Sequence, residues 1–222
     1  MTMDLPEKAG FMVLSGVTLF PRQMLPLHIF EPRYRQMLDE ALDGHRLFGV
    51  ALRQEDSLDE TPHGIAGLGL VKVSVQQPGG TSNLILEGVG RVKLLKRDES
   101  KPYPCYEIER LCPQIEDEEA FERSIDRLHA MMERILDEGV LACMPDAIDG
   151  DCEEGQMLLK SMEMLKRRID AEEDPERLID VVACAFLNDP EQKQSILGAE
   201  SLDLRLERTV ELLKKRLGDC EG

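Results

Sequence analysis

Two glycine-rich stretches are the first candidates for chemistry, because backbone N–H groups beside glycine can hold phosphate. Gly79-Gly80-Thr81 has no lysine where a phosphate-binding loop carries one. Gly88-Val89-Gly90 lacks the third glycine of a dinucleotide fingerprint, since Lys93 stands at that position. Neither stretch predicts a nucleotide site, so we expect no cofactor.

Two further pairs have the residue types of metal or nucleophilic chemistry. His129 and Glu133 are four residues apart, but no H-E-x-x-H motif or cysteine pair accompanies them, so we interpret them as a solvated hydrogen-bonded pair. Lys160 stands beside Ser161, and adjacent residues of a helix point to different faces. The sequence therefore predicts no catalytic residue and no metal site, and a protein that is not an enzyme.

The candidate binding residues lie in a loop that two prolines, Pro21 and Pro26, hold at its ends. This pinning lowers the entropy that the loop loses when it binds a ligand. The candidates for contact with a peptide are Phe20, Arg22, Met24 and Leu25. Met24 leaves two alternatives open: it faces a ligand, or it fills the core of the surrounding domain.

The elements around this loop can be read from the residues that follow it. The apolar run from Leu25 to Phe30 predicts a strand, and Pro26 should either start that strand or lie at a sheet edge, because proline cannot donate to the ladder. Pro32 suits the first position of a helix, and Gly44 suits a left-handed cap at its end. The sequence therefore predicts a loop, a strand and a capped helix in direct succession.

Glu31, Arg33 and Tyr34 stand where this strand passes into the helix. We interpret them as residues that lock the junction by charge-assisted hydrogen bonds, although Glu31 and Arg33 facing a ligand is the alternative. A partly buried carboxylate without a partner is unfavourable. We therefore expect Glu31 to pair with an arginine, either Arg33 or Arg91.

The same residues carry a family resemblance. Phe20-Pro21, Pro26-Leu27 and Ile29–Tyr34 resemble the signature of the LON substrate-binding domain, and so do Leu86–Arg91 and the helical segment Pro190–Leu197 followed by Arg205-Leu206. Family members usually carry Gly or a small polar residue after Phe-Pro, where this chain has Arg22. The residues that match the motif and that we assign a structural role are Pro26, Glu31, Arg33, Tyr34 and Arg91.

The two halves of the chain differ in periodicity and in charge. Short strand-like runs occupy the first half: 11–14, 25–30, 47–52, 65–76, 83–88, 91–96 and 106–111. Among them, Val71, Val73 and Val75 alternate with polar residues, which is the two-residue period of a half-buried strand. The second half carries helical stripes from Glu116 onward, and Asp174-Pro175 and Asp189-Pro190 both open helices.

Charge supports a boundary near residue 113. Residues 1–112 have a net charge of −2, from 13 Lys/Arg and 15 Asp/Glu, whereas residues 113–222 have −15, from 14 and 29. We therefore predict an α+β protein: a LON-type curled pseudo-barrel β-domain with one inserted helix over 1–114, then an all-helical bundle over 115–222.

Composition excludes several classes of partner. A net charge of −17 repels phosphate, so we expect no nucleic acid. No stretch of 18 consecutive apolar residues predicts a membrane span, and no export signal is visible. The six cysteines lack C-x-x-C spacing and are expected to be reduced thiols. We predict a cytoplasmic protein of undetermined oligomeric state.

The resemblance implies recognition of unfolded or exposed apolar polypeptide without proteolysis. A sheet edge and a loop bearing methionine suit that role, because an extended peptide can add to the edge while the flexible side chain adapts. The alternative is an adaptor or regulator that docks one folded partner, such as a protease. The identity of the client or partner is left open by the sequence.

Overall fold

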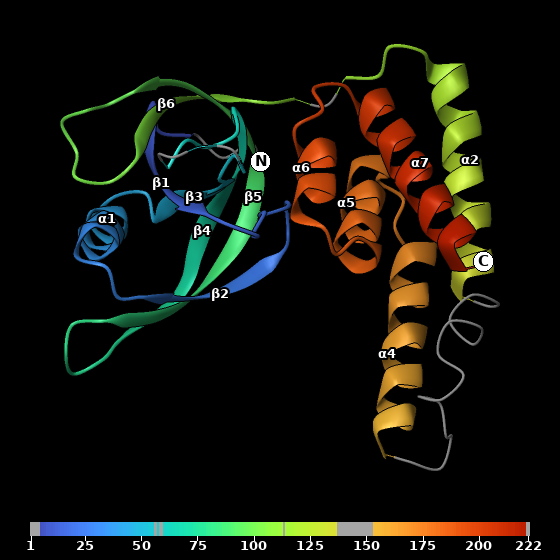
Figure 1. Ribbon diagram of the computed structural model, residues 1–222, viewed down its shortest axis with the longest axis horizontal. Helices are drawn as coiled ribbons and strands as arrows, with labels where there is room; N and C mark the ends of the chain where they lie inside the picture. The colour runs from blue at the N-terminus through green and yellow to red at the C-terminus, as the bar shows by residue number, and fades with distance from the viewer. Residues whose placement is uncertain (1–4, 56, 58–59, 113, 137–152, 221–222) are drawn as a thin grey trace. The chain divides into compact units, whose positions relative to one another are not determined.

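The computed structural model describes residues 5–55, 57, 60–112, 114–136 and 153–220 (Figure 1). Contacts divide them into two compact units. The β unit takes the described residues up to Cys112 together with Asn188–Gly198, and the helical unit takes the others. Segment 188–198, which the sequence analysis assigned to the helical half, thus belongs to the β unit by its contacts. The domain boundary at 114/115 stays a prediction.

The β unit is built on one six-stranded sheet. Its strands are β1 (Lys8–Leu14), β2 (Met24–Ile29), β3 (Leu47–Leu52), β4 (Ile65–Gln76), β5 (Ser82–Arg97) and β6 (Cys105–Arg110). They are ordered β2-β5-β4-β3-β1-β6, and β6 also pairs with β5, so the sheet curls back on itself while β2 stays at an edge. Only β1 and β3 are parallel. The predicted α+β class with a curled pseudo-barrel is confirmed, although the barrel is not regular.

Strand β5 runs without a break through Gly88 and Gly90, where the sequence analysis expected two separate strand-like runs, 83–88 and 91–96. Gly88 lies opposite Gly69, and Gly90 lies opposite Leu68, so both belong to the ladder between β4 and β5. A Cβ atom on Gly88 would collide with the carbonyl oxygen of Phe20. Glycine is needed here because another segment of backbone crosses the strand at close range.

A β-bulge in β4 changes which face its valines occupy. Val71 lies opposite Leu86, but Val73 lies opposite Ile85, so one extra residue has entered β4 between them. An insertion of one residue turns all following side chains to the other face. Val71 is buried, whereas Val73 and Val75 are exposed. The alternation in the sequence therefore does not describe a single buried face.

Helix α1 (Pro32–Asp43) covers part of the sheet. Its buried residues Tyr34, Met37 and Leu38 join the larger of the two core clusters described within the β unit, which also contains Met12, Leu19, Ile29, Phe48, Val50, Val71, Leu84, Leu86, Tyr103 and Cys105. Pro32 occupies the first turn as predicted. Gly44 has φ −111° and is not left-handed; Arg46 adopts φ 59° instead, and its N–H bonds the carbonyl of Ala41 at 2.7 Å.

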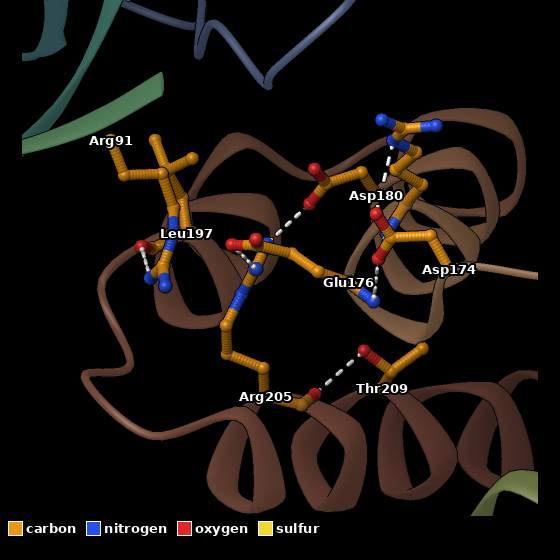
Figure 2. A network of polar contacts seen from close by, with 8 residues as sticks. Arg91, Asp174, Glu176, Asp180, Leu197, Arg205 and Thr209 are labelled. Atoms are coloured by element: carbon orange, nitrogen blue, oxygen red, sulfur yellow. Dashed lines mark hydrogen bonds and ion pairs between the residues drawn. The ribbon is translucent and has the colours of Figure 1, made fainter. Parts of the chain in front are cut away.

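Helix α6 (Pro190–Leu197) completes the β unit. The side chain of Asp189 caps it by accepting from the N–H of Gln192 at 2.8 Å. The amide of Gln194 donates to the carbonyl of Ile65 at 2.9 Å. Arg91 Nη1 donates to the carbonyl of Leu197 at 3.0 Å, as Figure 2 shows. One side chain of α6 and one side chain of β5 thus hold this helix, which is distant in sequence, to the sheet.

The helical unit contains α2 (Glu118–Arg134), α4 (Glu153–Asp170), α5 (Pro175–Phe186) and α7 (Leu202–Cys220). Asp117 and Asp174 cap α2 and α5 by accepting from backbone N–H groups of the first turn. α7 packs against α2 and α5 through an apolar core that includes Phe121, Leu128, Met132, Leu178, Val182, Leu206, Val210 and Leu213. Within the described residues, no helix is long and apolar enough to span a bilayer.

A buried arginine joins two of these helices. Arg205 of α7 has no exposed surface and donates to Glu176 at 2.9 Å and to Asp180, both on α5 (Figure 2). The hydroxyl of Thr209 donates to the carbonyl of Arg205 at 2.8 Å. The guanidinium itself has no exposed surface and meets two carboxylates, of which Asp180 is buried and Glu176 is 25% exposed.

Candidate functional site

The loop between Phe20 and Leu25 is held on β5 by backbone hydrogen bonds. The N–H of Arg22 donates to the carbonyl of Gly88 at 2.7 Å, and the N–H of Gly88 donates to the carbonyl of Gln23 at 2.9 Å. The side chain of Gln23 closes the turn by accepting from the N–H of Phe20 at 2.9 Å. The loop is therefore preformed, as its two prolines predicted.

The four loop residues predicted to contact a peptide are not all at the surface. Phe20 is completely buried, which removes it as a surface contact. Leu25 is half-buried and packs against the larger core cluster. Arg22 is exposed and Met24, the first residue of β2, is 53% exposed, so Met24 does not fill the core. Their role in binding stays a prediction.

Arg22 adopts a left-handed backbone conformation with φ 61°. This conformation is unfavourable for most residues with a Cβ atom and is readily adopted by glycine. The geometry explains why a glycine suits the position after Phe-Pro. It also directs a long cationic side chain out of the loop beside β2.

The outer face of β2, β5 and β4 is apolar. Two aligned rows cross these three strands: Pro26, Ile85 and Val73 form one, and His28, Asn83 and Val75 form the other. Large exposed apolar side chains on or beside this face are Met24 (53%), Phe30 (60%), Val73 (54%) and Val75 (53%). We call the surface formed by these two rows together with Met24 and Phe30 the outer face.

A small polar group lies within the outer face. His28 Nδ1 is 2.7 Å from Asn83 Oδ1, and the imidazole stacks on the ring of Phe30 at 5.9 Å between centroids. The hydrogen bond joins β2 to β5, and the stacking holds a phenylalanine at the surface. The apolar side chains are thus presented on a braced sheet.

Charged side chains are nearly missing from the outer face. Residues 23–30 contain no Asp, Glu, Lys or Arg, and residues 64–90 contain only Lys72 and Glu87. These two pair with each other at 2.8 Å. Since 32% of all residues in the chain are charged, this uncharged surface is a local exception. Sequence reasoning did not identify Phe30, Val73, Val75 and Ile85 as site residues. The scarcity of charged residues in segments 23–30 and 64–90 is the signal that could have identified them.

The junction after β2 is locked as predicted. Arg33 Nε donates to Glu31 Oε2 at 2.9 Å, so Arg33 is the expected partner of Glu31, and Arg91 is not. The same guanidinium donates to both oxygens of Glu60 at 2.5 and 2.7 Å and lies 4.5 Å from the ring centroid of Tyr34. These bonds hold the pKa of Glu60 below its usual value and raise that of Arg33.

A hollow of about 480 Å³ lies beside this junction. It is lined by Arg33, Glu60, Thr61, Pro62, Leu95, Arg97, Pro102, Pro104 and Tyr106. Burial raises the pKa of Tyr106. Two charged groups of the wall, Arg33 and Glu60, pair with each other, and Arg97 pairs at 3.5 Å with Glu99, which does not line the hollow. The charged groups that line the hollow are therefore already engaged.

No catalytic constellation is seen in the described part of the chain. The hydroxyl of Ser161 donates to the carbonyl of Met157 at 2.8 Å, within its own helix. Among the residues placed by the structure, no three His, Cys, Asp or Glu side chains gather as a metal site. The arrangement therefore offers an apolar surface, a strand edge and a cation, which are groups for binding.

Relatives with similar sequences are Lon proteases. The Lon protease of Dictyoglomus thermophilum is 25% identical over 219 residues, which is 97% of this chain and 25% of the relative. Lon protease 2 of Syntrophobacter fumaroxidans is 30% identical over 109 residues, which cover 47% of this chain and 14% of the relative. The chain thus spans about a quarter of the first of these proteins, and less of the second.

Solved structures with a similar fold are N-terminal domains of Lon proteases. The N-terminal domain of the Mycobacterium avium complex Lon protease matches with a TM-score of 0.62 at 15% identity, over 93% of this chain and 98% of that one. A Lon N-terminal domain protein from Xanthomonas campestris matches with 0.58 at 18%, over 92% and 97%. The family model of the ATP-dependent protease La (LON) substrate-binding domain matches residues 9–215. The chain belongs to the LON substrate-binding domain family.

Proposed function

We propose that the protein binds unfolded polypeptide, or apolar segments exposed on other proteins, at the outer face and does not cut them. The observation that carries this proposal is the exposure of Met24, Phe30, Val73 and Val75 on or beside one surface whose strands carry only the paired charges of Lys72 and Glu87. Contiguous exposed apolar surface on a soluble domain is a mark of an interaction site. Membership of a family named for substrate binding supports the same role.

The chemistry of the outer face suits clients of varied sequence. Methionine is flexible and polarizable, so Met24 can adapt to different apolar side chains. The rows of β5 and β4 are rigid because hydrogen bonds in the sheet fix their spacing. Low charge lets an apolar segment approach without desolvating ions. An adaptable residue beside a rigid apolar surface favours recognition of a class of segments over one sequence.

The test is binding of a permanently unfolded probe, fluorescein-labelled reduced and carboxymethylated α-lactalbumin, followed by fluorescence anisotropy. Val75→Asp places a charge in the outer face and is expected to weaken binding about tenfold, equivalent to about 1.4 kcal/mol. Leu95→Asp is the matched control, since Leu95 is an apolar residue of β5, 50% exposed, that lines the hollow instead.

Thermal unfolding of both variants should match the parent protein, because both side chains are already exposed. Affinity unchanged by Val75→Asp would contradict the proposal. If Val75→Asp and Leu95→Asp weakened probe binding equally, the result would also contradict the proposal, since it would show a general effect of added negative charge.

One observation favours the adaptor that docks a folded partner. Met157 and Met164 of α4 are 73% and 63% exposed, and their seven-residue spacing places them on one helix face. In that case Met164→Asp would abolish recovery of a single stoichiometric partner, and Val75→Asp would leave that recovery intact.

A further inference from the structure

Strand β2 has a backbone edge that the β unit does not use. Among the described strands, β2 pairs with β5 alone and ends the strand order of the sheet. Proteins usually protect such edges with charged residues, prolines or covering segments. Residues 23–30 carry no Asp, Glu, Lys or Arg, and Pro26 is the single proline within β2. The edge is therefore only weakly protected.

The ladder shows which backbone groups face away from β5. Gly88 donates to the carbonyl of Gln23, and these two residues continue the register in which Leu25 lies opposite Leu86. In an antiparallel ladder, bonded pairs alternate with pairs whose N–H and C=O groups point outward. Met24, Pro26 and His28 therefore present their backbone groups at the edge. Pro26 agrees with this assignment, because its missing N–H would break the ladder at a bonded position.

We propose, on the basis of the function proposed above, that the polypeptide binds as an added strand along the edge of β2. The N–H groups of Met24 and His28 donate to it, and the carbonyls of Met24, Pro26 and His28 accept from it. These residues alternate along β2, and an extended chain repeats its backbone groups with the same two-residue spacing.

The side-chain rows define the chemistry of the added segment. The residues that present backbone groups at the edge, Met24, Pro26 and His28, also carry the side chains of the outer face. An added strand extends the Pro26–Ile85–Val73 row by one side chain, and that side chain meets apolar surface. The occupant is an extended segment with apolar residues at alternate positions.

The charge of Arg22 further restricts which segments can bind along β2. Arg22 is the only Asp, Glu, Lys or Arg from Leu19 to Phe30, and it lies at the start of β2. Its exposed guanidinium favours an acidic residue in the part of the segment that passes the start of β2 and disfavours a basic one. The outer face therefore fits an apolar segment that is uncharged or acidic.

The experiment follows amide hydrogen exchange of this protein with and without carboxymethylated α-lactalbumin. The amides of Met24 and His28 should exchange rapidly in the free protein and slow at least tenfold on binding. The amide of Leu27, which faces β5, should be protected in both states and serves as the internal control. Binding that leaves Met24 and His28 unprotected would overturn the edge proposal.

A pair of variants gives an independent measurement. His28→Pro removes the outward N–H, and His28→Val removes the imidazole while keeping that N–H. We expect His28→Pro to bind the probe at least fivefold more weakly than His28→Val, at equal Tm. Equal affinities would overturn the proposal; if His28→Pro lowers Tm, the exchange experiment decides.

The outcomes separate this proposal from the one on which it rests. Failure of the probe to bind at all would reject the proposed function. Binding that Val75→Asp weakens, with exchange of Met24 and His28 unchanged, would reject edge addition and keep the outer face. Protection of these amides that rises with protein concentration alone would show that a second copy occupies the edge, which also rejects the proposal.

Discussion

Each unit contains an arginine that pairs with two carboxylates, Arg205 in the helical unit and Arg33 in the β unit, and these two sites differ in burial. Arg205 is fully buried and meets Glu176 and Asp180. The side chain of Arg33 is 30% exposed and meets Glu31 and Glu60, which are 37% and 42% exposed. Both sites contain one guanidinium and two carboxylates, but of these two arginines only Arg205 is shielded from solvent.

This difference determines what each site contributes. Water can replace a lost partner of Arg33, so its ion pairs are worth little and weaken with salt. Arg205 and Asp180 are both buried, so removing either of them leaves the charge of the other in the interior without its buried partner. The buried site therefore makes the pairing of α5 with α7 intolerant of single changes, whereas the exposed site tolerates them.

The largest effect is expected for Arg205→Met. The change leaves Asp180 buried beside an apolar side chain, and we expect it to lower the free energy of unfolding by about 3–5 kcal/mol. Chemical denaturation followed by circular dichroism measures this. The double variant Arg205→Met with Asp180→Leu removes both buried charges and should recover most of the loss. A single-variant loss below about 1 kcal/mol would contradict the comparison.

A smaller effect is expected for Arg33→Met, which removes the guanidinium from the exposed site. We expect a loss of about 1 kcal/mol, because Glu31 and Glu60 regain hydration. The loss should shrink in 1 M NaCl, where exposed charges are screened, while that of Arg205→Met should not. The same salt dependence in both variants would mean that burial does not separate the sites.

Acid should reveal a third network, in which Glu40 accepts from Lys101 at 2.6 Å, Tyr103 at 2.6 Å and Gln36 at 2.9 Å. These bonds lower the pKa of Glu40 from 4.5 to about 2. A lowered pKa contributes stability above pH 4.5, and that stability is lost as the pH falls toward 2. Unfolding midpoints between pH 6 and 2 should therefore fall less steeply in Glu40→Gln. Parallel curves would exclude this contribution.

The smallest effect is expected for Glu31→Gln. Arg33 keeps both bonds to Glu60, and the new amide still accepts one hydrogen bond, so we expect a loss of about 0.5 kcal/mol or less. Denaturation midpoints beside those of Arg33→Met measure the difference. A loss as large as that of Arg33→Met would mean that Glu31, and not Glu60, is the principal partner.

Local rules made the junction and the caps predictable. Pro32 begins α1, Asp174-Pro175 begins α5, and Arg33 pairs with Glu31 because these features depend on residues close in sequence. The outer face was not predictable in the same way. Val73 and Val75 are exposed because pairing with β5 inserts a bulge after Val71, and no local pattern reveals that pairing. Phe20 is buried because Gly88 admits its backbone, which is also a long-range relation.

The position of α6 has a consequence for synthesis of the chain. The β unit contains residues up to Cys112 and then Asn188–Gly198, so a ribosome releases its last helix long after its sheet. At about 5–20 residues per second the interval is roughly 4–17 seconds. During that time Gln194 and Leu197 have not been synthesised, so the hydrogen bonds from Gln194 to Ile65 and from Arg91 to Leu197 cannot form. The sheet of the nascent chain therefore lacks the contacts of α6, and chaperones can reach it, until that helix has been translated.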